Sequence, residues 1–134
     1  IYLYRHGRLR ALTRDHSQVE AARSQRKPNC DDTLLRPPAN VITRALGAAD
    51  TLEIDTALVD VRDGDVFLLC TDGLSNEVSD VAIERALLPR NCRYASQALL
   101  DLALERGGHD NITAVVVRAE DLTSPDRTAM HPVL

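Results

Sequence analysis

Short runs of apolar residues recur along this chain of 134 residues, and turn-forming residues separate them. Runs of this length with β-branched or alternating apolar side chains are typical of strands. They predict strands at 1–5, 9–12, 41–44, 52–61, 66–70 and 112–117, with 52–61 forming one long strand or two short ones. The run at 66–70 is apolar without interruption, so we expect this strand to be covered on both faces of its sheet.

Two segments between the last two runs carry apolar residues at helical spacing. One helix is predicted between Ser79, as its N-cap, and Pro89, which ends it; a longer one runs from Asn91 to the glycine pair at 107–108. A weakly apolar helix is predicted after 13–17. Because short turns, and not helical crossovers, join most of the strands, we expect an α+β domain with antiparallel sheets and helices on the outside.

Two stretches show no usable periodicity. Residues 24–39 hold three prolines and two adjacent aspartates, and they are predicted to form a loop. Residues 121–134 are predicted to form a mobile tail. Since the chain opens directly in a strand-like run, we expect it to be part of a longer polypeptide and its first strand to lack partners that lie upstream.

The composition is that of one domain with a modest core. Three widely spaced cysteines predict reduced thiols and not a disulfide framework. No apolar run approaches the ~20 residues of a membrane span, so we expect a soluble, cytoplasmic protein without a membrane partner. Residues 1–50 carry a net charge of +4 and residues 51–134 one of −8. The basic residues, Arg5 among them, could meet phosphate, but few aromatic residues accompany them, which argues against nucleic acid.

Two aspartates flank predicted strands. Asp72 follows the strand at 66–70, and Asp110 precedes the strand at 112–117. Carboxylate oxygens suit magnesium or manganese, and neither stretch has the Cys/His spacing that is typical of zinc. Both residues are therefore candidate ligands of a hard divalent cation. The alternative is that each is only a turn or loop residue at a strand end.

Other polar residues are predicted to have structural roles and not to bind a metal ion. His6, His16 and His109 are expected to have surface or hydrogen-bonding roles, because oxygen-rich sites do not need them. Asp63 and Asp65 flank a glycine, but their spacing does not match the EF-hand, so a hairpin turn is predicted instead of a calcium loop.

Five motifs follow one another at 1–9, 12–17, 40–47, 64–74 and 108–113. In this order they resemble the C-terminal half of the catalytic domain of the bacterial metal-dependent type 2C protein serine/threonine phosphatases. The resemblance spans residues 1–120. It implies two antiparallel β-sheets sandwiched between helices, present here as a partial domain. Residues 18–39 take the place of the family's flap, a loop that borders the cleft.

The resemblance also implies roles for single residues. Asp72 and Asp110 match the family's metal-ligand aspartates, which are catalytic through the metal, while Gly73 and Asn111 match supporting positions beside them. The implied cofactors are two or more Mg²⁺ or Mn²⁺ ions. The implied activity is hydrolysis of phosphoserine and phosphothreonine by metal-activated water. The implied partners are phosphorylated proteins, together with a cognate serine/threonine kinase.

The family's upstream half contributes further groups to this chemistry. It supplies a metal-bridging aspartate in an Asp-Gly-x-Gly-Gly stretch, an arginine that holds the phosphate, and a Gly-Asp-Ser-Arg stretch. Neither stretch occurs in these 134 residues. We therefore expect the chain to be inactive by itself. The alternative function is a non-catalytic, phosphatase-like module that binds a phosphoprotein or a regulatory partner.

Overall fold

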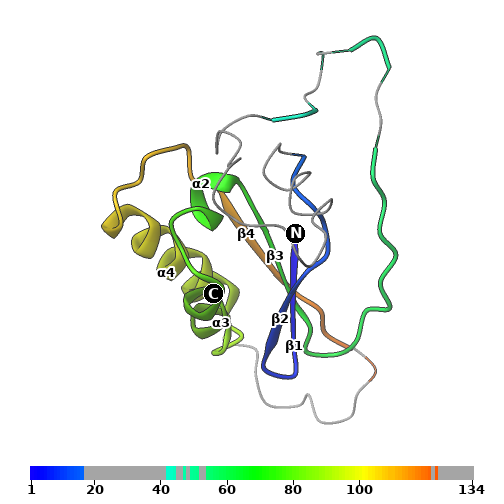
Figure 1. The fold of residues 1–134 in the computed structure, drawn as a ribbon. Helices are drawn as coiled ribbons and strands as arrows, with labels where there is room; N and C mark the ends of the chain where they lie inside the picture. Colours follow the sequence, from blue (N-terminus) through cyan, green and yellow to red (C-terminus); the bar gives the residue numbers. More distant parts are fainter. Residues whose placement is uncertain (17–41, 45–46, 48, 52–53, 122, 124–134) are drawn as a thin grey trace, which may run out of the picture. The chain divides into compact units, whose positions relative to one another are not determined.

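The computed structural model describes residues 1–16, 42–44, 47, 49–51, 54–121 and 123, and every structural statement below concerns these residues. They divide into two units, the described residues of 1–12 and 58–123 in one and those of 13–57 in the other. The elements, all in the first unit, are β1 (Tyr2–Arg5), β2 (Arg8–Ala11), β3 (Val66–Cys70), α2 (Asp72–Ser75), α3 (Asp80–Leu87), α4 (Cys92–Glu105) and β4 (Ala114–Arg118) (Figure 1).

The strands form one antiparallel sheet in the order β2-β1-β3-β4. His6 and Gly7, with φ of 51° and 78°, make the two-residue turn between β1 and β2. Two successive left-handed residues suit a tight hairpin, because their twist matches that of the strands. β1 is therefore an inner strand with neighbours on both edges, and the expectation that it lacks pairing partners was wrong.

One face of the sheet packs on α3 and α4. Alternate side chains of β1 and β3, among them Tyr4, Val66 and Leu68, point to this face and are buried. The helices contribute Ile83, Ala86, Leu87, Ala95, Leu99 and Ala103, which are at most 6% exposed. Each fully buried leucine of this set contributes about 1.5–3 kcal/mol, so this layer carries most of the hydrophobic stabilisation of the unit.

The opposite face of the sheet is apolar, and it is exposed along β3 and β4, whereas Leu3 of β1 on the same face is 2% exposed. Phe67 pairs with Val117, and Leu69 pairs with Val115, across β3 and β4. Leu69, Val115 and Val117 are 39%, 49% and 48% exposed. The expectation that the strand at 66–70 is covered on both faces was therefore wrong for the described residues. These residues contain one sheet of the implied sandwich, and the α+β class is confirmed.

The two long helices agree with the sequence prediction. Asn91 accepts a hydrogen bond from the backbone N–H of Tyr94 at 3.0 Å and so caps α4. Ser79 precedes α3 as predicted, but its side chain makes no capping hydrogen bond. Cys92 near the start of α4 is a half-buried thiol. Among the described residues, no helix has the length and apolarity that crossing a membrane requires.

Two predicted strands are absent from the residues that the structure describes. The described residues at 42–44 and 54–61 contain no strand of the sheet. Ile54, Leu58 and Val61 are between 62% and 103% exposed, so these apolar side chains pack on no sheet. Alternation of apolar residues makes a strand only where a neighbouring strand pairs with it. Other predictions fall outside the described residues: the helix after 13–17, the loop at 24–39, the flap at 18–39 and most of the tail at 121–134.

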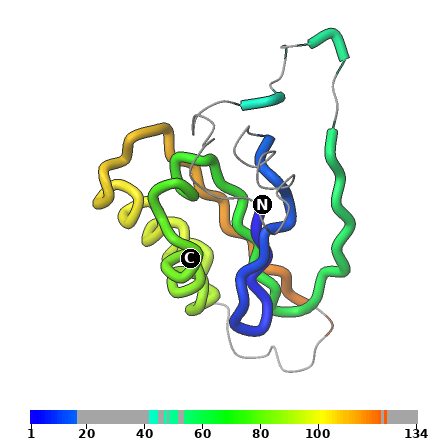
Figure 2. The backbone as a smooth tube through the Cα atoms, viewed as in Figure 1, coloured from blue at the N-terminus to red at the C-terminus, as the bar shows by residue number. Residues whose placement is uncertain are grey.

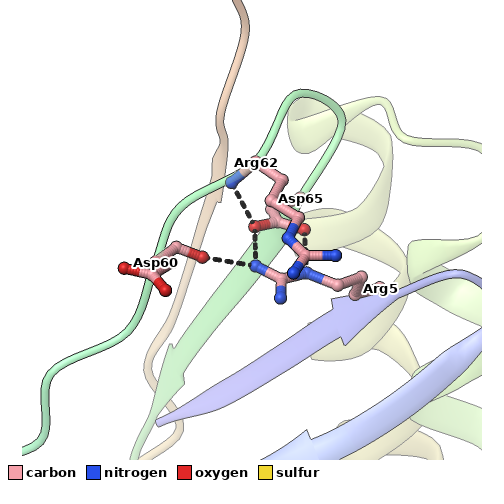
Figure 3. Close-up of polar contacts among 4 residues, drawn as sticks. All are labelled: Arg5, Asp60, Arg62 and Asp65. Carbon is pink, nitrogen blue, oxygen red and sulfur yellow. Dashed lines mark hydrogen bonds and ion pairs between the residues drawn. The ribbon is translucent and has the colours of Figure 1, made fainter.

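An ion pair between the half-buried Arg5 and the buried Asp65 joins β1 to the start of β3 (Figure 3). Asp65 is 1% exposed, and its two carboxylate oxygens accept hydrogen bonds from Nε and Nη2 of Arg5 at 2.7 and 2.5 Å. The backbone N–H of Arg62 donates to the same carboxylate at 2.8 Å, and Arg5 also donates to the backbone oxygen of Asp60 at 2.6 Å. Arg5 therefore has a structural partner here, whereas the sequence only marked it as a basic residue that could meet phosphate.

The predicted turn at Asp63 and Asp65 is present, with the N–H of Asp65 donating to the carbonyl of Arg62 at 3.1 Å. The hydrogen bonds from Arg5 hold the pKa of Asp65 below its ordinary value, and that from Arg62 adds to this effect. A carboxyl whose pKa is lowered by folding stabilises the protein above its unfolded pKa. That contribution disappears as the pH falls through the folded pKa.

We predict that Asp65→Asn lowers the free energy of unfolding at pH 7 by about 1.5–3 kcal/mol, because it removes the charge from the buried partner of the half-buried Arg5. The measurement is urea unfolding of the native polypeptide, meaning the product that the gene encodes. The difference from wild type should narrow as the pH is lowered from about 5 to below about 3.

Asp60→Asn is the matched control. It keeps the backbone oxygen that Arg5 contacts and alters only an exposed carboxylate, so its effect should stay below about 1 kcal/mol. A loss in Asp65→Asn that is as small as that of the control, or that is the same at every pH, would contradict this account of the pair.

Candidate functional site

Asp72 stands where a strand becomes a helix. β3 ends at Cys70, Thr71 is extended with φ −82° and ψ 164°, and α2 begins at Asp72 itself. The sequence placed Asp72 after the buried strand, and the structure confirms this position with the addition of the short helix. Asp72 is exposed, whereas the two residues that follow it, Gly73 and Leu74, are buried.

Asp110 lies in the loop that returns from α4 to β4. Gly107 and Gly108, with φ of 123° and 55°, turn the chain after α4 into left-handed conformations that side chains disfavour. The carboxylate of Asp110 accepts a hydrogen bond from the N–H of the next residue, Asn111, at 2.7 Å. Figure 2 traces this loop from the end of α4 past α2 and into β4.

Hydrogen bonds of Thr71 tie the two aspartate segments together. The N–H of Thr71 donates to the carbonyl of Thr113 at 3.2 Å, one step beyond the last strand pair of Cys70 and Ala114. The Thr71 hydroxyl donates to the carbonyl of Asn111 at 2.9 Å and accepts from the N–H of Thr113 at 3.0 Å. The loop that carries Asp110 is thereby fixed to the residue directly before Asp72.

Gly73 lets the same two segments approach closely. A Cβ at Gly73 would lie 2.5 Å from the carbonyl oxygen of Asn111 and 3.3 Å from Cβ of Asp110. Such a contact with backbone is shorter than van der Waals packing allows, so only glycine fits without a shift. The structure therefore brings together all four residues that the sequence singled out: Asp72, Asp110, Gly73 and Asn111.

The three histidines have the kind of role that the sequence predicted. His6 is exposed in its turn, and Nδ1 of His109 lies 3.0 Å from a carboxylate oxygen of Glu77. Arg106 donates to the backbone oxygen of Glu77 at 2.7 Å, so the segment after α2 contacts the loop after α4 a second time.

The second unit holds a charged cluster of His16, Arg44 and Asp55. Nε2 of His16 and Nη1 of Arg44 lie 2.6 and 3.2 Å from the two carboxylate oxygens of Asp55. These contacts, that of His16 first, hold the pKa of Asp55 below its ordinary value. The N–H of Thr43 donates to the carbonyl of His16 at 2.7 Å. The cluster joins two of the motifs, and sequence reasoning missed Asp55 because nothing in its neighbourhood distinguishes it from a surface residue.

The donor set beside α2 fits a hard divalent cation in kind but supplies only part of a coordination shell. Asp72 and Asp110 offer carboxylate oxygens, which magnesium and manganese prefer. Within the described part of the chain, no three His, Cys, Asp or Glu side chains gather in a way that could hold a metal ion. A cation at this place would take its other ligands from water or from groups beyond the described residues.

Comparison with known proteins gives the class. No family model matches the chain. It is 36% identical over 129 residues to the serine/threonine phosphatase stp of Listeria monocytogenes, an alignment that covers 96% of this chain and 51% of the relative. It is 34% identical over 133 residues to the serine/threonine protein phosphatase PstP of Mycobacterium tuberculosis, with 99% of this chain and 25% of the relative covered. The chain thus spans about half the length of the Listeria relative.

Solved structures agree with the sequence relatives. PppA of Pseudomonas aeruginosa, described as a key regulatory component of T6SS, superposes with a TM-score of 0.76 at 39% identity over 87% of this chain and 47% of that one. The catalytic domain of PstP in complex with two manganese ions gives 0.73 at 35% identity over 90% and 49%. The sequence relatives are serine/threonine phosphatases, and the superposed structures share the fold of this chain. The chain is a homologue of about half of a type 2C phosphatase domain, and the resemblance seen in the sequence is confirmed.

We predict that Gly73→Ala lowers the free energy of unfolding by about 1–3 kcal/mol, because the new methyl group overpacks against the Asn111 carbonyl. Urea unfolding measures the loss, and ¹H–¹⁵N spectra should show shifted amide signals at 110–113. Gly7→Ala is the control for the spectra: its left-handed φ of 78° strains an alanine and lowers stability too, but the open space around it should leave the amide signals of 110–113 unchanged. If Gly73→Ala leaves the amide signals of 110–113 where they are in wild type, the close approach is not a constraint.

Proposed function

We propose that the native polypeptide containing this chain is a metal-dependent protein serine/threonine phosphatase, and that Asp72 and Asp110 contribute carboxylates to its metal site. One observation carries the proposal. The segments that carry two exposed aspartates, separated in the sequence by α3 and α4, are held against each other by contacts of Thr71 and Gly73. The names of the relatives supply the reaction class, and the PstP structure with two manganese ions supports a metal site.

The chain's own residues position the metal and do not themselves attack the substrate. Asp72 and Asp110 would hold the cation, and the network of Thr71, Gly73 and Asn111 would keep the two carboxylates at a constant separation. A bound divalent cation lowers the pKa of its water and neutralises charge on a phosphate. Carboxylates that are fixed before binding need little reorganisation, which favours a well-ordered site.

The finer parts of the proposal concern cofactor and substrates. Mg²⁺ or Mn²⁺ would serve as the metal, with two or more ions in a complete domain, since oxygen ligands suit both. The substrates would be proteins phosphorylated on serine or threonine, and the kinase that phosphorylates them would act in the same system. The names of the relatives support protein substrates.

Asp72 and Asp110 do not make a complete catalytic site. We propose that a bridging aspartate and a phosphate-holding arginine come from a further segment that corresponds to the uncovered half of the relatives. Two carboxylates alone leave most of the coordination shell of a cation to water, and a site with few protein ligands binds weakly.

We predict that Asp72→Asn and Asp110→Asn each remove most of the manganese-dependent hydrolysis of p-nitrophenyl phosphate by the native polypeptide. Each change removes a charged ligand and no core contact, because both residues are exposed. The free energy of unfolding should therefore change by less than about 1 kcal/mol, and manganese affinity, measured by isothermal titration calorimetry, should fall at least tenfold.

Asp101→Asn is the matched control, an exposed aspartate on α4 whose carboxylate accepts only a local hydrogen bond from Gln97. It should keep wild-type turnover and manganese affinity. Wild-type activity in either site variant, with unchanged circular dichroism, would overturn the assignment. Wild-type protein without turnover that still binds phosphopeptides would favour the non-catalytic module.

We further predict that the 134 residues expressed alone show no appreciable phosphatase activity and only weak manganese binding. Fusing the part of the Listeria phosphatase that the alignment leaves uncovered to this chain should restore manganese-dependent hydrolysis, and the same fusion with Asp72→Asn should not. Tight binding with turnover by the 134 residues alone would show that the missing half is dispensable and that this account of the site is wrong.

A further inference from the structure

The backbone carbonyl of Thr71 cannot accept the hydrogen bonds of both the β3–β4 ladder and the first turn of α2. Its carbonyl oxygen accepts from the N–H groups of Leu74 and Ser75, at 3.1 and 3.5 Å, and so belongs to the first turn of α2. In a regular antiparallel ladder that carbonyl would instead accept from the N–H of the facing residue, Thr113. The change from strand to helix therefore takes an acceptor away from β4 at the point where the site begins.

The Thr71 side chain replaces the lost acceptor and adds a donor. Its hydroxyl accepts from the N–H of Thr113 at 3.0 Å and donates to the carbonyl of Asn111 at 2.9 Å. A hydroxyl can accept and donate at once, whereas valine, which has the same shape, can do neither. Serine offers the same hydroxyl without the methyl group.

These two bonds act on the backbone next to Asp110. The carbonyl of Asn111 is drawn toward Thr71, and it is also the atom that would lie 2.5 Å from a Cβ at Gly73. The Thr71 hydroxyl holds this oxygen by a hydrogen bond, and the absence of a side chain at Gly73 leaves the room that the oxygen occupies. The peptide that follows Asp110 is thus held at a set place relative to Asp72.

We propose that Thr71 is a positioning residue for the metal site: its hydroxyl fixes the Asp110 loop to the start of α2 and so sets the separation of the two carboxylates. This rests on the proposed metal-binding role of Asp72 and Asp110. Residues that orient ligands typically change metal affinity by about 10–100-fold when they are replaced.

The test measures manganese affinity of the native polypeptide by isothermal titration calorimetry, with thermal unfolding followed by circular dichroism. Thr71→Val should weaken binding at least tenfold, and Thr71→Ser should stay within about threefold of wild type. Thr113→Val is the matched control, because it replaces a threonine hydroxyl by a methyl group at the residue that faces Thr71 across the ladder. In the described part of the chain the hydroxyl of Thr113 has no hydrogen bond to lose, so this variant should bind manganese as wild type does.

A second readout follows the hydrogen bond itself. The amide of Thr113 should exchange with solvent faster in Thr71→Val than in Thr71→Ser, and this comparison needs no metal. Should Thr71→Val fail to fold, Thr71→Ala replaces it in both measurements. Equal manganese affinity in wild type and Thr71→Val, or a loss in Thr71→Ser as large as in Thr71→Val, would overturn the proposal.

Asp72→Asn, measured beside these variants, separates the two ideas. A loss of affinity in Asp72→Asn without one in Thr71→Val means that the metal site stands and that Thr71 does not position it. Unchanged affinity in Asp72→Asn means that the metal site itself is wrongly assigned.

Discussion

The antiparallel pairing of β3 with β4 is the constraint on which the candidate site depends. The register runs from Val66 with Arg118 to Cys70 with Ala114, so the strand that leads into α2 ends beside the strand that leaves the Asp110 loop. This ladder brings two segments about 40 residues apart in the sequence to one place. Beyond the end of the ladder, the hydroxyl of Thr71 holds the Asp110 loop by its hydrogen bonds to Asn111 and Thr113.

The far end of the same strand is fixed by a different interaction. Asp65, directly before β3, is held by Arg5 of β1, while its carbonyl accepts from the N–H of Ala119 at 2.8 Å and the N–H of Gly64 donates to the carbonyl of Ala119 at 2.9 Å. β3 is therefore anchored at both ends to its neighbours. A central strand that cannot slip is a suitable support for ligands that must keep a constant separation.

Local patterns in the sequence were sufficient to predict the parts that depend on local physics. The cap at Asn91 and the buried stripe of α4 follow from helical periodicity, and Asp72 and Asp110 follow from their places at strand ends. The pair of Arg5 and Asp65 was missed because its partners are 60 residues apart and neither carries a local signal. Of the strand predicted at 52–61, the described residues 54–61 form none, for the related reason that pairing depends on a partner, which alternation along one segment does not reveal.

Paramagnetic broadening by manganese tests most directly whether the two aspartates belong to one metal site. In ¹H–¹⁵N spectra of the native polypeptide, substoichiometric Mn²⁺ broadens amide signals according to their proximity to the ion. The account predicts that the signals of Asp72 and Asp110 disappear first and together, over the same range of Mn²⁺ concentration. Broadening that centres on another part of the chain, or that reaches the two aspartates at clearly different concentrations, would contradict a shared site.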